Sequence, residues 1–369
     1  MRIWTPDGRL VLAVRNRWEL TRLITTTLSV FSDLGIARDE MQNHFTVFEA
    51  EHAPTVVIKK SAFTMEETPR WRSRCQSLPR DFPQVTYLPY TMTSSNLSTI
   101  PLRKPADPRG PCRGASRKSK DDISPCSDDE PYFYKMDRGG PQEYLWLLEG
   151  IVGFSFLVVW LPFRFMRKKA TSSDLRSVVL PLFVLSSFGV GAMVLEISLF
   201  QKLVLYLGSP TISLSVLFSS LLVGMGVGSY FGKRIYEAEL RMRSFLVSLC
   251  IVVVGILFAI VSPYVLSKCL EYSLGLRSSV CFLMILPLAL LLGIPFSSCI
   301  QMLTRENKGK HVPWMYGVNG IMSVVGSVLA IVLSMLIGFT PTYFVGLAFY
   351  LGIFVLLVFA GVGTTPATV

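Results

Sequence analysis

One carboxylate in this sequence stands where charge is costly. Glu196 lies within an apolar stretch of membrane-spanning length, and such a residue normally faces a bundle interior or a polar cavity. It would bind a proton or a cation there, or fix helix packing through a hydrogen bond to a group such as Asn319. Gln201 and Lys202 end the same stretch, where a lysine can extend its ammonium towards the membrane surface. These four residues form the candidate intramembrane polar site.

A row of glycines occupies the next apolar stretch. Gly224, Gly228 and Gly232 recur every four residues, so they share one face of a helix. Small residues at this spacing let another backbone approach closely, which is typical of helix packing in membranes. The pattern predicts a packing face. A face that binds another membrane subunit is the alternative.

No set of residues in the sequence forms a complete reaction centre. The three histidines are scattered, the cysteines form no CxxC pair, and there is no GxSxG, HExxH or phosphate-binding glycine loop. We therefore predict no catalytic, cofactor-binding or metal-binding residue. The net charge of +11 comes without a nucleic-acid motif, so we expect no nucleic-acid partner.

The elements that position these residues are apolar segments. Of the 369 residues, 51% are hydrophobic and only 17% are charged, which is low for a soluble protein. Seven segments come near the ~20 residues that a helix needs to cross a bilayer. They are 144–165, 178–200, 211–232, 244–265, 279–299, 314–337 and 341–362. We predict a mainly α-helical multi-pass membrane protein, with the lipid bilayer as a partner and the cell membrane as its location.

Loop charge predicts the orientation of these spans. The loops at 164–177, 232–243 and 300–313 are rich in Lys and Arg, and the loops between them are poorer. The positive-inside rule therefore places these three loops and the C-terminus in the cytoplasm. An odd number of spans then places the N-terminal segment on the other side.

Residues 1–90 have the pattern of an incomplete α/β subdomain. We expect strands at 9–14, 45–50, 55–59 and 85–88, and helices at 18–34 and 65–78. Gly35 is expected to end the first helix, and Thr64 with Glu67 to form a capping box at the second. These elements amount to the last third of a doubly wound domain. They lack the glycine-rich turn and the acidic residue of its cofactor-binding half.

The remaining segments connect and flank these parts. Residues 91–128 are rich in Ser, Thr, Pro, Arg and Lys and are expected to be a flexible linker. Residues 129–143 lead into the membrane, the bundle spans 144–362, and 363–369 form a tail.

Several of these stretches together resemble a known family. The run LEISLFQKLVLYLGSPTISLSVLFSSLLVGMGVGS and the later run GIPFSSCIQMLTRENKGKHVPWMYGVNGIMSVVGSVLAIVLSMLIGFTPT resemble the transmembrane repeat of the membrane-bound spermidine synthase-like proteins. ISPCSDDEPYFY, with Asp128, Asp129 and Pro131, is similar to the segment that links that family's enzyme domain to its spans. DGRLVLAVRNRW and VVIKKSAFTMEE are similar to the terminal strands of its class I methyltransferase-like domain.

The resemblance implies an aminopropyltransferase-like enzyme that uses a decarboxylated S-adenosylmethionine-type cosubstrate. The residues that hold such a cosubstrate in the family have no counterpart in this sequence, so we expect this chain alone to be inactive and to carry no cofactor. A missing N-terminal domain or another membrane subunit is then an expected partner. Two other functions stay open, a transporter that uses Glu196 and a membrane scaffold that uses the glycine face.

Overall fold

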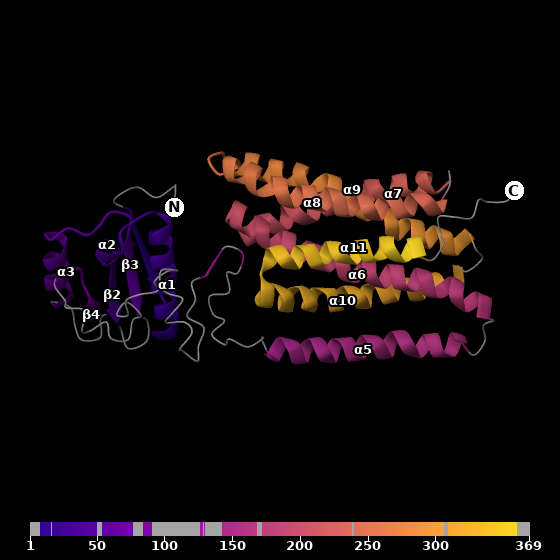
Figure 1. The fold of residues 1–369 in the computed structure, drawn as a ribbon, viewed down its shortest axis with the longest axis horizontal. Coiled ribbons are helices and arrows are strands. Elements are labelled where there is room, and N and C mark those ends of the chain that lie inside the picture. The colour runs from indigo at the N-terminus through magenta and orange to yellow at the C-terminus, as the bar shows by residue number, and fades with distance from the viewer. Residues whose placement is uncertain are drawn as a thin grey trace. The chain divides into compact units, whose positions relative to one another are not determined.

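The computed structural model describes residues 8–15, 17–49, 54–76, 84–90, 126–127, 129, 142–167, 172–237, 240–305 and 309–359. The chain divides into two compact units, Met1–Gly139 and Gly140–Val369. Figure 1 shows the elements of both units.

The first unit holds a small antiparallel sheet. Its strands are β1 (Arg9–Ala13), β2 (Phe45–Glu49), β3 (Thr55–Lys59) and β4 (Gln84–Tyr87), in the order β1-β3-β2-β4. β3 pairs with β1 on one side, with Val11 opposite Val57, and with β2 on the other, with Val47 opposite Val56. The hairpin consists of β2 and β3, and β3 therefore lies between β1 and β2.

Helices and apolar side chains cover this sheet. Helix α1 (Arg17–Asp33) presents Ile24, Leu28 and Phe31 to a buried cluster that contains Phe45, Val47, Val56 and Ile58. The opposite face holds a smaller cluster of Phe48, Val57 and Phe63. The helices α2 (Arg38–Met41), η1 (Gln42–His44) and α3 (Glu67–Gln76) complete the described part of the unit. Neither of the short helices α2 and η1 was expected from the sequence.

The predicted stop of α1 at glycine is confirmed. Gly35 has a φ of +76°, which side chains disfavour. The backbone N–H of Ile36 donates to the carbonyl of Phe31 at 3.1 Å, and that of Gly35 donates to Ser32 at 3.0 Å. This pair of bonds satisfies carbonyls at the end of the helix.

The second unit contains seven long apolar helices among the described residues. They are α5 (Gln142–Arg167), α6 (Ser172–Leu207), α7 (Pro210–Glu237), α8 (Leu240–Cys269), α9 (Leu274–Arg305), α10 (Val312–Ile337) and α11 (Phe339–Phe359), with η4 (Gly309–His311) before α10. Each has a stretch that is long and apolar enough to cross a bilayer. The chain is a helical multi-pass membrane protein, as its composition predicted.

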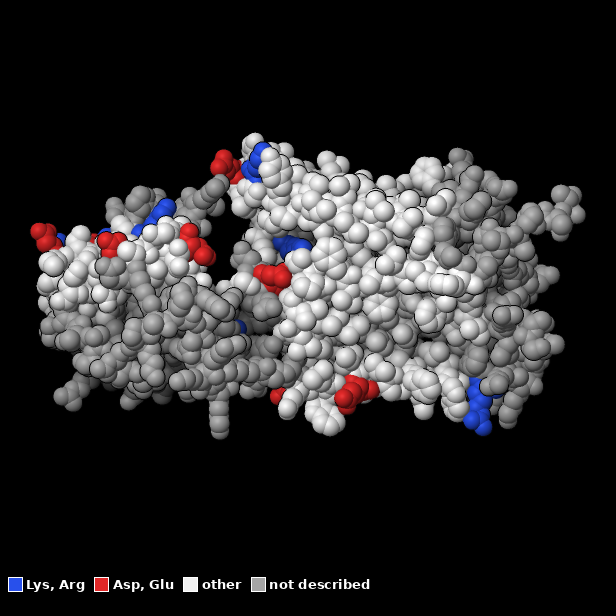
Figure 2. Space-filling model, viewed as in Figure 1, with Lys and Arg blue, Asp and Glu red and all other residues white. Residues whose placement is uncertain are grey.

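The helices of the second unit pack in two groups. α6 packs extensively on α10 and α11, and α9 packs on α7 and α8 (Figure 1). α5 packs on α10 and is the least buried of the seven. Figure 2 shows that the described surface over the helices is almost free of Lys, Arg, Asp and Glu in that view. Such a surface suits a lipid environment.

Candidate functional site

Glu196 lies in the C-terminal half of α6, among residues that build the bundle core. Leu195 and Leu199 on either side are 1% exposed, and Glu196 itself is half-buried. Among the described residues, Glu196 has no hydrogen bond and no ion pair. A carboxylate in this position is costly unless it takes a proton or meets a cation, so it remains the sharpest candidate for chemistry in the membrane.

Lys202 and Gln201 lie further along α6. The ammonium of Lys202 sits 5.4 Å from the ring centre of Tyr343 in α11, which is a cation–π contact. Gln201 is half-buried. The lysine therefore joins α6 to α11 near one end of both helices.

Asn319 does not pair with Glu196. It lies on α10 against Gly189 of α6, where a Cβ on Gly189 would come within 3.1 Å of the Asn319 side-chain oxygen. That oxygen, Oδ1, is buried and has no hydrogen-bond partner within the described part of the chain. Gly189 precedes Glu196 by seven residues, or about 10 Å along the helix. Glu196, Gln201 and Lys202 therefore lie on α6, whereas Asn319 lies on α10 and contacts α6 about two helical turns before Glu196.

The predicted glycine face packs within the chain. Gly224, Gly228 and Gly232 of α7 all face α9, where added Cβ atoms would overlap Ala289, the carbonyl of Leu290 and the Ser297 hydroxyl. Gly293 of α9 faces the backbone of Met225 in return. The two backbones are in contact, as the small-residue pattern predicts. Since α9 fills this face, it is not free to bind another subunit.

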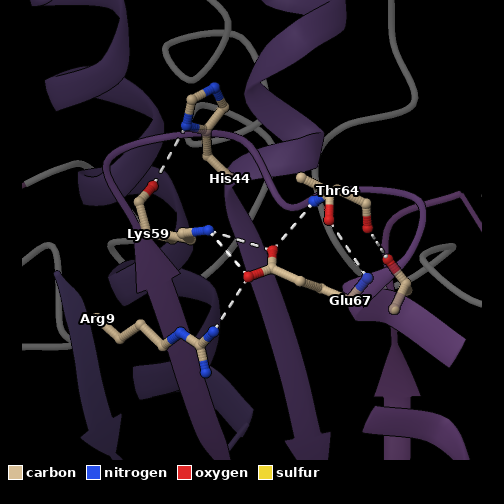
Figure 3. Close-up of polar contacts among 6 residues, drawn as sticks. Arg9, His44, Lys59, Thr64 and Glu67 are labelled. Carbon is tan, nitrogen blue, oxygen red and sulfur yellow. Dashed lines mark hydrogen bonds and ion pairs between the residues drawn. The ribbon is translucent and has the colours of Figure 1, made fainter. Parts of the chain in front are cut away.

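A polar network joins the sheet and α3 in the first unit (Figure 3). The ammonium of Lys59, a side chain only 6% exposed, donates to both carboxylate oxygens of Glu67, at 3.2 and 3.1 Å. Arg9 of β1 donates to the same carboxylate at 3.2 Å. His44 donates from Nδ1 to the Lys59 carbonyl at 3.2 Å, which fixes the tautomer of its ring. The burial of Lys59 was not predicted from the residue pattern.

Glu67 also forms the predicted capping box. The Thr64 backbone N–H donates to the Glu67 carboxylate at 3.1 Å, and the Glu67 N–H donates to the Thr64 hydroxyl at 3.3 Å. Partial burial alone would raise the pKa of Glu67. The hydrogen bonds from Thr64 and Lys59 and the charges of Lys59 and Arg9 outweigh this effect and lower the pKa.

Tyr87 closes the other side of this sheet. It is 4% exposed, and its hydroxyl donates to the carbonyl of Gln42 at 3.0 Å. Burial, with a smaller contribution from Tyr90, raises the pKa of Tyr87 to about 12. The network and this tyrosine stabilise the sheet, and neither forms a constellation of nucleophile and base.

The segment before the membrane makes a described contact with α1. The Cys126 backbone N–H donates to the Thr26 hydroxyl at 3.1 Å. Of the predicted linker motif, Asp129 is described and half-buried, whereas Asp128 and Pro131 lie outside the described residues. The contact places residue 126 beside α1.

Comparison with known proteins adds no assignment: no protein-family model, no curated protein and no solved structure matches this chain. Among the described residues, no group of three or more His, Cys, Asp or Glu side chains could hold a metal ion. The candidate sites therefore rest on geometry alone.

Proposed function

We propose that this chain is an integral membrane protein of the spermidine synthase-like family, and that its first unit carries the terminal strands of a class I methyltransferase-like domain. The strand order supports this proposal. A late strand (β1), a helix (α1) and a hairpin (β2 and β3) follow one another, and β3 inserts antiparallel between β1 and β2. Such an arrangement suits the closing end of an open sheet whose other strands would lie beyond β1.

The outer edge of β1 is the observation that carries this proposal. Within the described residues, β1 pairs only with β3. Leu10 and Val11 of β1 are 41% and 60% exposed. An apolar, unpaired strand edge is a liability in water, and proteins normally cover it. A further strand of a methyltransferase-like sheet would pair with the edge of β1, and the helices on the two faces of that sheet would cover Leu10 and Val11, which point to opposite faces.

We expect this chain by itself to have no aminopropyltransferase activity. A doubly wound domain holds its nucleotide cofactor with a glycine-rich turn after its first strand and an acidic residue further on. The described strands here are joined by a helix, a hairpin and a second helix, and none is followed by such a turn. We therefore expect the unit to support a membrane assembly and not to transfer aminopropyl groups by itself.

Isothermal titration of decarboxylated S-adenosylmethionine into the purified full chain tests this proposal. We expect no saturable heat, whereas a soluble aminopropyltransferase titrated in parallel gives a binding isotherm. A saturable isotherm with the full chain would refute the negative assignment. Hydrogen exchange of β1 tests the edge separately, because an uncovered edge predicts fast exchange at alternate β1 amides and protection at the amides bonded to β3.

A further inference from the structure

The six helices α6 to α11 contain a repeat. Adding 100 to a residue number in α6 gives a counterpart in α9 that has the same burial at most positions. The two helices also share the pattern Ser-x-x-Gln-x-Leu at 198–203 and 298–303. The paired buried residues are Leu185 and Ile285, Phe188 and Leu288, Ser198 and Ser298, Leu199 and Cys299, and Leu203 and Leu303. α6 and α9 are therefore equivalent helices with the same inward face.

The helices that follow them correspond in the same way. With a shift of 98, Leu217 matches Met315, Ser220 matches Val318, and Gly228 matches Gly326, all buried. α8 and α11 correspond with a shift of 95, which pairs Ser248 with Tyr343 and Gly255 with Tyr350. The repeats are α6–α8 and α9–α11, and α5 stands outside them.

Close glycine contacts between helices are also equivalent in the two repeats. Gly228 of α7 lies against the carbonyl of Leu290 in α9. Its counterpart Gly326 of α10 lies against the carbonyl of Val190 in α6, 2.7 Å from where a Cβ would stand. Val190 is itself the counterpart of Leu290. Exchanging the two repeats thus converts the α7–α9 contact into the α10–α6 contact, as a two-fold rotation axis would.

The axis lies in the plane of the membrane. Three contacts show that α6 and α9 run antiparallel: Arg277 Nη1 donates to the Tyr206 carbonyl at 3.1 Å, the rings of Phe188 and Phe296 lie 6.0 Å apart, and Cys299 Sγ lies 4.0 Å from the Pro181 carbonyl. The first and last of these contacts each join the start of one helix to the end of the other. The two helices therefore cross near the middle of both. Repeats of three spans that cross in opposite directions are inverted-topology repeats, the architecture of many secondary transporters.

The axis also divides the bundle into two halves that are not the repeats themselves. One half is α6 with α10 and α11, and the other is α9 with α7 and α8 (Figure 1). Glycine contacts join α6 to α10 and α11 in one half, and α7 to α9 in the other. The halves meet where α6 crosses α9, through Phe188 with Phe296 and Arg277 with Tyr206. They also meet where α8 packs on α11, through Gly255 against Leu347 and through Tyr343, which donates to the Gly255 carbonyl at 2.9 Å.

Glu196 breaks this symmetry. Its counterpart is Phe296, which fills space between Phe188 and Tyr316, with ring centres 6.0 and 4.9 Å away. One half thus has a carboxylate without a described partner where the other has a packed phenyl ring. Glu196 lies about 5 Å along α6 from the middle of the span Val179–Leu207.

We propose that the two halves move against each other about the α6–α9 crossing and expose Glu196 to the two sides of the membrane in turn, so that the bundle exchanges a small cation for a proton, each bound by this carboxylate in turn. Substrate and ion sites of inverted-repeat carriers lie near the midplane, between the repeats. Glu196 lies near the middle of its span, and its counterpart Phe296 contacts Phe188 where α6 and α9 meet. This inference does not depend on the family proposed above, because it uses only contacts within the second unit.

Thiol cross-links at opposite ends of the crossing test the motion. The full chain keeps Cys281 and Cys299, its other cysteines become serine, and Leu185→Cys and Leu199→Cys are added. Leu185 shares a buried cluster with Cys299, and Leu199 shares one with Cys281. Mercuric ion bridges the pairs in lipid vesicles, and mass spectrometry of peptides counts them. A third pair, Val194→Cys with Ala330→Cys, lies within one half and serves as the control.

The structure has contacts at both ends of the α6–α9 crossing at once, so both end pairs should bridge when mercuric ion is added. Motion of the halves predicts that each end opens in turn without mercuric ion, so that N-ethylmaleimide modifies the thiols of both end pairs while the control pair stays protected. Protection of both end pairs as complete as that of the control pair would show a rigid bundle and overturn the proposal. The single-pair variants, each with one end pair, show whether the substitutions permit folding, because each must still bridge.

Vesicles loaded with a pH-sensitive dye test the cargo. We expect a gradient of Na⁺ or K⁺ to change the internal pH in the presence of the protein. Glu196→Gln should abolish the change, and either end cross-link should stop it. Glu149→Gln is the matched control, since Glu149 is an exposed carboxylate on α5, outside the repeats. Equal rates for the wild type and Glu196→Gln, or no protein-dependent pH change in either gradient, would contradict the cation site while leaving the family proposal untouched.

Discussion

Glu67 holds three groups at once, and its charge matters for each. It accepts hydrogen bonds from the buried Lys59 ammonium, from Arg9 and from the backbone that begins α3. Loss of its charge would remove this carboxylate from the Lys59 ammonium, in a side chain only 6% exposed. Removing a carboxylate from a buried charge is more costly than losing a surface ion pair. The residue is therefore structural, and its effect should appear as stability.

We predict that Glu67→Gln destabilises the first unit by about 1 to 3 kcal/mol at neutral pH. The folded state lowers the pKa of Glu67, so its stabilising contribution is present above the unfolded pKa of about 4.3 and is lost as pH falls through the folded pKa. Urea unfolding of the full chain between pH 7 and pH 3, monitored by hydrogen exchange of β3 peptides, measures this contribution of Glu67 to stability. The variant should lose this pH dependence. Glu66→Gln, an exposed neighbour, is the control, and an equal loss in both variants would contradict the assigned network.

At the scale of helices, the glycine face of α7 could be predicted from the sequence, but the helix that packs against it, α9, could not. Spacing alone places Gly224, Gly228 and Gly232 on one face, because the helical period fixes which side chains share it. The same spacing says nothing about which helix approaches, since any apolar span offers a compatible surface. The partner α9 supplies Gly293 and the carbonyl of Leu290, and these match α7 only in three dimensions.

We predict that Gly228→Ala destabilises the bundle by about 1 to 3 kcal/mol, because the added methyl group overlaps the Leu290 carbonyl and must push α7 and α9 apart. Gly326→Ala should have a similar effect on α6 and α10, since the two-fold exchange relates the two contacts. Gly226→Ala is the control on α7, because nothing lies within 4 Å of its added Cβ. Unfolding of the full chain in mixed micelles by increasing SDS measures all three. An effect of Gly226→Ala as large as that of Gly228→Ala would contradict the contact.

At the scale of the whole molecule, composition predicted more than motifs did. The bilayer sets the length of an apolar helix, so the seven helices followed from hydropathy. The strands followed from short apolar runs between turn residues. The intramembrane polar site did not follow, because Glu196 of α6 and Asn319 of α10 were grouped by polarity, whereas Asn319 lies against Gly189, about two helical turns along α6 from Glu196. The repeat was also hidden, since its evidence lies in matched burial and exchanged contacts more than in shared residues.

The two units also depend on different solvents, which predicts how the molecule unfolds. The first unit buries its apolar cluster away from water, with Phe31 at 0% exposure. The second exposes large apolar residues such as Leu222, at 69%, which lipid or detergent must cover. Urea should therefore unfold the full chain in detergent micelles in two transitions, the first unit unfolding at the lower concentration.

Two buried substitutions assign these transitions. Phe31→Ala should lower only the first, by about 3 to 5 kcal/mol, and Leu195→Ala only the second, by about 2 to 5 kcal/mol, because each leaves a cavity in one core. Hydrogen exchange of peptides from β2 and from α6 follows the two units in one experiment. If both sets of peptides lose protection at the same urea concentration, and each substitution shifts both, the units fold as one cooperative body and the division is wrong. Separate shifts mean that the sheet can change, gain strands or lose them while the membrane bundle keeps its own stability.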